Sequence, residues 1–191
     1  MTFVRSKAAK KLGLLHRIRR RLPALVVRTL YITCIRPTLE YASGAWGGLG
    51  VQDANRLERL QRCAARSIAQ VSISDKLPHD LLLARAGLEP LSVRRLLAVV
   101  TPVYHLASDP PKGPDHLRAA FQSWLGSAPS SSSSVCLRSS SSNGLRLPRA
   151  RTELLRHSPF YRGVSFLNSL SSEVKASLSS IKSRILSLSD C

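Results

Sequence analysis

Short runs of apolar residues at helical spacing, separated by prolines and glycines, dominate the first half of the chain. In the first run, Leu12, Leu15, Ile18 and Leu22 are three or four residues apart, with arginines crowding positions near its end. This spacing places the four side chains on one face of an α-helix. Because a proline disrupts a helix from within, each run is predicted to form a helix of its own. The sequence therefore predicts a mainly α fold, a small bundle of short amphipathic helices.

Prolines and candidate caps set the expected limits of the first three helices. The first ends near Leu22, and Pro23 suits the opening of the second. Pro37 should kink or end that second helix. After a glycine-rich turn at 43–50, Asp53 or Asn55 is expected to cap the third. The apolar positions of the second and third helices are Leu25, Val26, Leu30, Ile32 and Ile35, and Leu57, Leu60, Ala64 and Ile68.

Two further helices are expected before residue 108. Pro78 opens a short fourth helix through Leu83 that Gly87 stops. Pro90 precedes a fifth, and Pro102 inside it is expected to disturb its last turn. The predicted buried stripe of this helix is Val93, Leu96, Leu97, Val100 and Tyr104.

A change in composition at Asp109 divides the chain into three parts. Residues 1–108 are predicted to form a helical module, and 109–143, with DPPKGPD and a serine tract, a flexible Pro/Ser-rich linker. Residues 144–191 form a tail, with an alternating extended segment around Leu145 and Leu147. A final amphipathic helix is expected through Val174, Leu178, Ile181 and Ile185.

The charge is strongly positive and unevenly placed. The chain has 29 Lys and Arg against 11 Asp and Glu, a net charge of +18, and no acidic residue before Glu40. Such a chain favours a polyanionic partner, and nucleic acid is the commonest. The first helix supplies the candidate phosphate ligands Arg5, Lys7, Lys10, Lys11, Arg17, Arg19, Arg20 and Arg21. A mitochondrial transit peptide and attachment of this helix to an anionic membrane are less favoured alternatives.

The cysteines Cys34, Cys63, Cys136 and Cys191 lack metal or redox spacing, which favours reduced thiols in an intracellular protein. The longest apolar run is interrupted by Arg28, so no membrane span or secretory signal is expected. No two aspartates are adjacent, the histidines lack zinc-site spacing, and no G-x-S-x-G string occurs. We therefore expect no catalytic or metal site, no cofactor and no small-molecule substrate.

Arginines on the third predicted helix form a regular row. Arg59, Arg62 and Arg66 are spaced at i, i+3 and i+7, which places them along one side of the helix. Alone, such a row is more often a solvated face. Beside a first helix without acidic residues, it favours a ridge that follows phosphates.

Four strings resemble non-LTR retrotransposon reverse transcriptases, which are RNA-directed DNA polymerases, in the region after the palm. They are IRPTLEYASGAWGG at 35–48, RLERLQRCAARSI at 56–68, GLEPLSVRR at 87–95 and LRLPRARTELLRHSPFYRGVSFLNSL at 145–170. The resemblance implies that the helices up to about Ala107 form a thumb-like module that packs against an RNA–DNA duplex. It also implies that the palm and fingers of a longer polyprotein are missing, because the family's adjacent aspartates do not occur here.

The same resemblance assigns individual residues. Glu40, Tyr41 and Trp46 match structural positions, with Glu40 a candidate partner of a nearby arginine. In the tail, Leu167 replaces the family's usual tryptophan and Ser171 a proline. The family's basic positions correspond to Arg36, Arg62, Arg66, Arg94 and Arg95, each a contact to phosphate or a brace of the fold.

Two hypotheses follow. The first is a noncatalytic nucleic-acid-binding fragment that contacts RNA–DNA or DNA duplex phosphates, with the nucleus favoured by the resemblance. The second is a degenerate retroelement remnant with no selected activity. An enzymatic role requires a separate palm subunit acting together with this chain.

Overall fold

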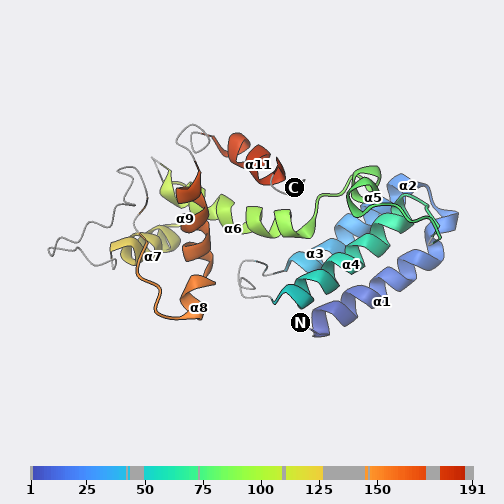
Figure 1. Ribbon diagram of the computed structural model, residues 1–191, viewed down its shortest axis with the longest axis horizontal. Helices are drawn as coiled ribbons and strands as arrows, with labels where there is room; N and C mark the ends of the chain where they lie inside the picture. The colour runs from blue at the N-terminus through green and yellow to red at the C-terminus, as the bar shows by residue number, and fades with distance from the viewer. Residues whose placement is uncertain are drawn as a thin grey trace. The chain divides into compact units, whose positions relative to one another are not determined.

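The computed structural model describes residues 2–41, 43, 50–72, 74–108, 111–126, 145, 147–170 and 177–187. Helices make up most of these residues, and no strand occurs among them, so the prediction of a mainly α fold is confirmed (Figure 1). The glycine-rich stretch around Trp46 and the serine tract lie outside the described residues.

The chain divides into two compact units. Unit 1 comprises Met1–Ser43, Leu49–Arg95 and Ser187–Cys191, and unit 2 comprises Gly44–Gly48 and Leu96–Leu186. The division falls inside one helix, α6 (Leu91–Ala107), whereas we expected a single module to extend to residue 108.

Unit 1 is built from three helical rods whose apolar faces meet. They are α1 (Thr2–Ile18) with η1 (Arg19–Arg21), the α2–η2–α3 rod, and α4 (Val51–Ile68). The short helix α5 (His79–Ala86) and the first turn of α6 cover the other side of α4. Six of the thirteen predicted stripe positions are buried: Leu12, Leu15, Ile35, Leu57, Ala64 and Ile68. In the second rod the predicted stripe is otherwise wrong, because Leu25 and Val26 are exposed and the neighbouring Val27 and Tyr31 are buried instead. Leu39, Leu82, Leu83 and Leu91 add to the core.

The second rod contains a π turn where the sequence analysis expected a kink or an end. It runs from α2 (Ala24–Leu30) through the π-helical η2 (Tyr31–Ile35) into α3 (Arg36–Glu40). The Arg36 N–H donates to the Tyr31 carbonyl, five residues back. Pro37 has no N–H to give Thr33, and its ring would crowd that carbonyl in an α-helix. The wider π turn just before Pro37 lets the rod continue to Glu40.

The expected cap of α4 is wrong. Gly50 is the N-cap residue, and its carbonyl accepts hydrogen bonds from the Asp53 and Ala54 N–H groups at 3.0 and 3.1 Å. The helix therefore begins before either predicted cap. Asp53 lies in the first turn, where a carboxylate favours the helix dipole, and it pairs with Arg56 at 3.1 Å.

The limits of α5 and the start of α6 agree with the sequence. Pro78 directly precedes α5, and Gly87 ends it in the left-handed conformation, with φ of 63°. α6 begins directly after Pro90 but continues through the exposed Pro102 to Ala107, so the expected disturbance of its last turn does not occur. Val93 and Val100 are buried as predicted, together with Val99, Val103 and Leu106, whereas Leu96, Leu97 and Tyr104 are only partly buried.

Unit 2 contains helices that the sequence analysis did not predict. α7 (Asp115–Gly126) lies inside the expected linker, so that prediction fails over 115–126. Leu117, Phe121 and Trp124 are at helical spacing, and Phe121 is buried against Phe160, with ring centroids 5.4 Å apart. In the tail, α8 (Glu153–Arg156) and α9 (Pro159–Ser169) begin at the side-chain caps Thr152 and Ser158.

The final amphipathic helix is α11 (Leu178–Ser187), with Ile181 and Ile185 buried as predicted. Val174 lies outside the described residues. The stretch 147–151 contains neither helix nor strand. The Asn168 side-chain amide of α9 accepts from the Leu145 N–H at 3.0 Å and donates to the Leu145 carbonyl at 2.7 Å.

Candidate nucleic-acid interface

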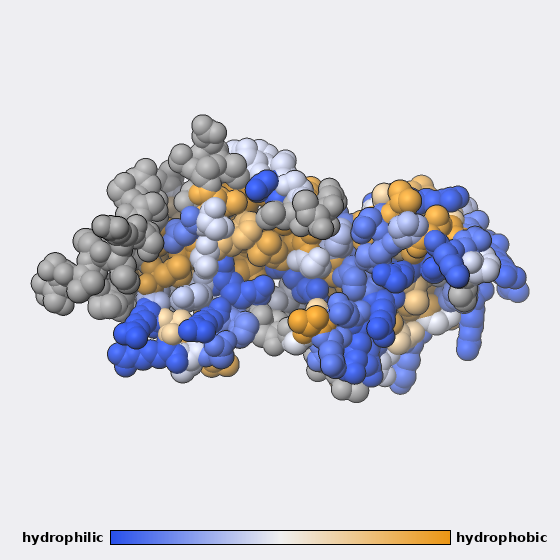
Figure 2. All heavy atoms as spheres, in the orientation of Figure 1, coloured by the Kyte–Doolittle hydropathy of each residue, from blue (hydrophilic) through white to orange (hydrophobic). Residues whose placement is uncertain are grey.

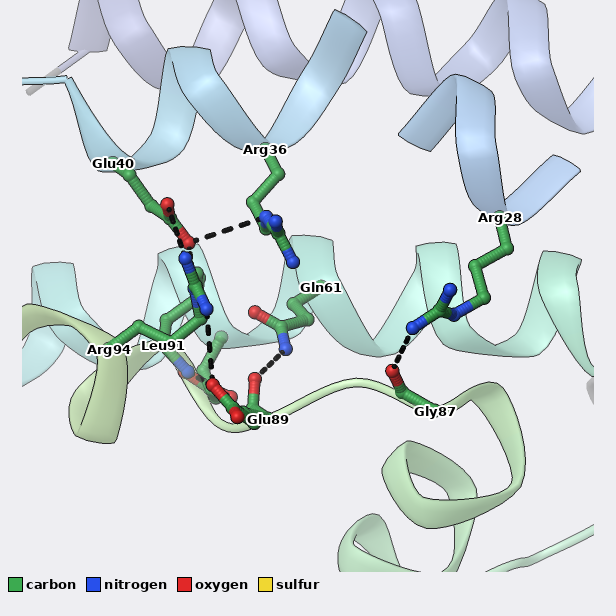
Figure 3. Close-up of polar contacts among 9 residues, drawn as sticks. Arg28, Arg36, Glu40, Gln61, Gly87, Glu89, Leu91 and Arg94 are labelled. Carbon is green, nitrogen blue, oxygen red and sulfur yellow. Dashed lines mark hydrogen bonds and ion pairs between the residues drawn. The ribbon is translucent and has the colours of Figure 1, made fainter. Parts of the chain in front are cut away.

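A cluster of polar side chains joins α3, α4 and the start of α6 in unit 1 (Figure 3). Arg94 donates from Nε and Nη2 to the carboxylate of Glu40, and from Nη1 to Glu89 at 3.1 Å. The Arg36 Nε lies 3.6 Å from the same Glu40 carboxylate. The hydrogen bond to Glu40 raises the pKa of the Arg94 guanidinium. Gln61 of α4 completes the cluster by donating to the Glu89 carbonyl at 2.6 Å.

Arg36 and Arg94, two of the candidate phosphate ligands, are partly buried and paired within this cluster. The side chains of Arg36, Glu40 and Arg94 are only about a quarter exposed, at 23%, 24% and 28%. A phosphate at Arg36 or Arg94 would have to compete with a carboxylate already in place. Arg36 and Arg94 therefore brace the fold, and the expected pairing of Glu40 with a nearby arginine is present.

Other predicted phosphate ligands donate to backbone carbonyls. Lys11 of α1 donates to the Cys34 carbonyl at 2.7 Å and to Thr38 Oγ1 at 3.1 Å. Arg19 reaches the Arg66 carbonyl at 3.5 Å, and Arg66 donates to the Ser72 carbonyl at 2.9 Å. Sequence reasoning missed a further brace, Arg28, which donates to the Gly87 carbonyl at 2.9 Å (Figure 3).

Arg62 is exposed but oriented by a histidine. Its Nε donates to His79 Nδ1 at 3.1 Å, and His79 Nε2 lies 3.3 Å from Glu58 Oε1. Because Nδ1 accepts from Arg62, the ring proton is assigned to Nε2, which faces the Glu58 carboxylate. The Nη groups of Arg62 form no hydrogen bond or ion pair with another described residue. Arg95, the remaining predicted position on α6, is partly buried.

The remaining candidates are exposed and form no ion pair with any other described residue. Ala8, Leu12 and Leu15 mark the buried side of α1, so Lys10 and Arg17 project from its opposite side. Figure 2 shows hydrophilic residues gathered over α1 and α4 of unit 1. The exposed candidates without such a pair are Arg5, Lys7, Lys10, Arg17, Arg20, Arg21 and Arg59.

α1 and α4 lie side by side, which brings their cations onto neighbouring rods. Near the carboxyl ends of the two helices, the His16 Nδ1 and Ser67 Oγ atoms are 3.3 Å apart. Arg59 thus belongs to the helix next to Lys10 and Arg17. Arg56, one turn before Arg59, is also exposed, and the i, i+3 spacing already visible in the sequence would have added it.

No group of three or more His, Cys, Asp or Glu side chains among the described residues is placed to hold a metal ion. The described helices include none that is both long and apolar enough to cross a membrane. The chain matches no family model, no curated protein and no solved structure.

Proposed function

We propose that unit 1 is a noncatalytic nucleic-acid-binding module that holds duplex phosphates through the exposed cations of α1, η1 and α4. One observation carries this proposal. Lys10, Arg17, Arg20, Arg21 and Arg59 are exposed and form no ion pair with another described residue, although glutamates and carbonyls elsewhere in the unit engage several of the other cations.

The spacing on α1 suits a phosphate backbone. Lys10 and Arg17 are two helical turns apart, a rise of about 10 Å. This distance is close to three base-pair steps of about 3.4 Å each. Long cationic side chains on such a ridge can follow the phosphates without reading bases, so the proposed binding is insensitive to sequence.

We also propose that unit 1 corresponds to the thumb-like module of a non-LTR retrotransposon reverse transcriptase, as the sequence resemblance implies. In this proposal a palm domain outside the present sequence carries out the polymerase reaction, and unit 1 binds the duplex. Arg36 and Arg94 support the fold of the module, which leaves α1 and α4 as its contact surface.

A salt titration tests the binding itself. Fluorescence anisotropy of a labelled DNA duplex, measured over a series of salt concentrations, gives the slope of log affinity against log salt. With roughly six phosphates neutralised, the expected slope is about −5. A slope between zero and −1 would contradict phosphate binding by this surface.

Competition tests the relation to a thumb. A thumb-like module should be displaced from a labelled RNA–DNA hybrid most readily by unlabelled hybrid, and less readily by single strands or heparin. Equal displacement by all three would instead identify a degenerate remnant that binds polyanions through charge alone.

A further inference from the structure

An apolar groove lies in unit 1 between α1 and the α2–η2–α3 rod. Its volume is about 690 Å³, and its lining includes Phe3, Leu14, Ile18, Leu30, Cys34 and Tyr41. The buried face of α1 is occupied by the core, so this groove is a second apolar surface of the same helix. The groove was not predicted from the sequence, because Phe3 and Leu14 fall outside the predicted apolar stripe of the first helix.

The side chains at the groove are unusually exposed for their type. Phe3 is 76% exposed, Leu14 63% and Tyr41 75%. Single exposed apolar residues are common on protein surfaces, but a contiguous set lining one groove marks an interaction site. A volume of this size accommodates several side chains of a partner.

Lysines form the rim of the groove on the α1 side. The Lys7 Nζ lies over the Phe3 ring, 6.0 Å from its centroid. Lys11, one turn further along, is held in place by the Cys34 carbonyl and Thr38. The described residues that line the groove include no Asp or Glu. The two ammonium groups, one helical turn apart at the edge of the apolar groove, favour a ligand that carries a carboxylate at that edge.

We propose that this groove binds an amphipathic helix of a partner protein, with apolar side chains at i, i+3 or i+4 and i+7 and acidic residues along the flank that faces Lys7 and Lys11. A helix laid between two rods buries such a stripe completely. A second copy of this chain fits poorly, because it would bring another charge of +18 onto this unit.

A membrane surface is also a poorer match. Membrane-binding helices present their apolar side chains on a convex face that enters the bilayer. Here Leu14, Ile18 and Leu30 line a concave space between two helices. Neither Lys10 nor Arg17 is among the residues that line the groove, and this proposal does not require nucleic-acid binding.

Selection from a displayed library of helical peptides, randomised at their surface positions, tests the proposal on the full chain. Recovered peptides should share an apolar stripe at i, i+3 or i+4 and i+7, with an excess of Glu and Asp beside it. Recovery of no binder, or of binders without the stripe or the acidic excess, would overturn the proposal.

Variants then locate the binding. Leu14→Glu should weaken the best recovered peptide by about thirtyfold, as expected for a central apolar anchor. Leu154→Glu, at an 87% exposed leucine of unit 2, is the matched control and should change nothing. Circular dichroism of both variants checks that the fold is kept. An equal effect of the two changes would contradict the assigned groove.

A charge swap tests the rim. Lys7→Glu should weaken an acidic peptide by about tenfold, and replacing the facing Glu of the peptide by Lys should restore the affinity. Co-sedimentation with mixed phosphatidylcholine and phosphatidylserine vesicles forms the last arm. If the parent chain binds these vesicles and Leu14→Glu abolishes that binding, the groove is a membrane-binding surface and the proposal of a partner helix is overturned.

Discussion

The Arg94 Nη2 donates to Glu40 Oε2 at 3.1 Å, which joins the first turn of α6 to the last residue of α3 across 54 positions of sequence. The same guanidinium also contacts Glu89, and the same carboxylate lies beside Arg36. Two arginines that the sequence offers to phosphate are thereby held within unit 1. Arg36 and Arg94 therefore differ from Lys10, Arg17 and Arg59, which are exposed and form no ion pair with another described residue.

Replacing Glu40 by Gln should lower the free energy of unfolding by about 2 kcal/mol, because Arg94 and Arg36 both lose a charged partner in a partly buried cluster. Glu89→Gln is the matched control. Its side chain is 46% exposed and contacts Arg94 alone, so the expected loss is below about 1 kcal/mol. Urea unfolding followed by circular dichroism measures both, and equal losses would contradict a central role for Glu40.

Replacing Tyr31 by Phe should leave the stability at neutral pH unchanged or higher. The Tyr31 hydroxyl is buried and has no hydrogen-bond partner among the described residues, so removing it relieves a desolvation cost of about 1 kcal/mol or more. A clear loss of stability in urea unfolding at pH 7 would show that the hydroxyl has a partner.

The same substitution should change the response to alkaline pH. Burial raises the pKa of the Tyr31 hydroxyl above its ordinary 10.0, against a smaller opposing influence of Arg36. Above pH 10 the unfolded chain releases the Tyr31 proton, whereas the folded state still holds it. The free energy of unfolding of the parent chain is therefore unaffected by this group below pH 10 and falls as the pH rises above 10. The advantage of Tyr31→Phe should grow by up to about 1.4 kcal/mol per pH unit above pH 10. An advantage that stays constant with pH would contradict the raised pKa.

Neutralising three exposed cations of α1 and η1 should reduce the salt dependence of duplex binding. The triple change Lys10→Gln, Arg17→Gln and Arg20→Gln is expected to make the slope of log affinity against log salt shallower by about 2.7. Lys112→Gln, Arg151→Gln and Lys182→Gln remove the same charge from exposed positions of unit 2. If this control variant makes the slope shallower by the same amount, the salt dependence reflects the net charge of the chain and not the α1 surface.

Adding a methyl group at Gly163 should destabilise unit 2. A Cβ there would lie 2.6 Å from Val103 Cγ2 and 2.9 Å from Val103 Cβ, where α9 packs against α6. Gly163→Ala is therefore expected to cost about 1–3 kcal/mol in thermal or urea unfolding.

Two further variants isolate this packing effect. Gly13→Ala places the same methyl group on an exposed helix with no atom within 4 Å, and it should stabilise by up to about 1 kcal/mol. Val103→Ala in the Gly163→Ala background should recover part of the loss. Failure of this second change to recover any stability would place the strain elsewhere.

Local chemistry made parts of the fold predictable. Pro23, Pro78 and Pro90 each directly precede a helix, and Gly87 ends one, because these residues act through their own backbone geometry. α7 was missed because the prolines and serines on either side of it dominate the composition. The spacing of Phe121 and Trp124 behind Asp115 was the available signal for that helix.

The roles of the cations were predictable only in part. The acid-free sequence of α1 correctly indicated an exposed basic surface, because exposure of long charged side chains is their ordinary state. The sequence alone could not separate Arg94 from Arg59. Glu40, which decides the role of Arg94, comes next to it only when α3 and α6 meet in the folded unit.

The π turn at Tyr31–Ile35 fixes the length of the segment between Pro23 and Pro37. A deletion of a single codon there would convert the π turn into an α turn, and the Pro37 ring would then crowd the carbonyl four residues before it. The exposed, non-helical residues 74–76 before α5 meet no such restriction. We therefore expect insertions and deletions to be tolerated between α4 and α5 and rejected within the rod.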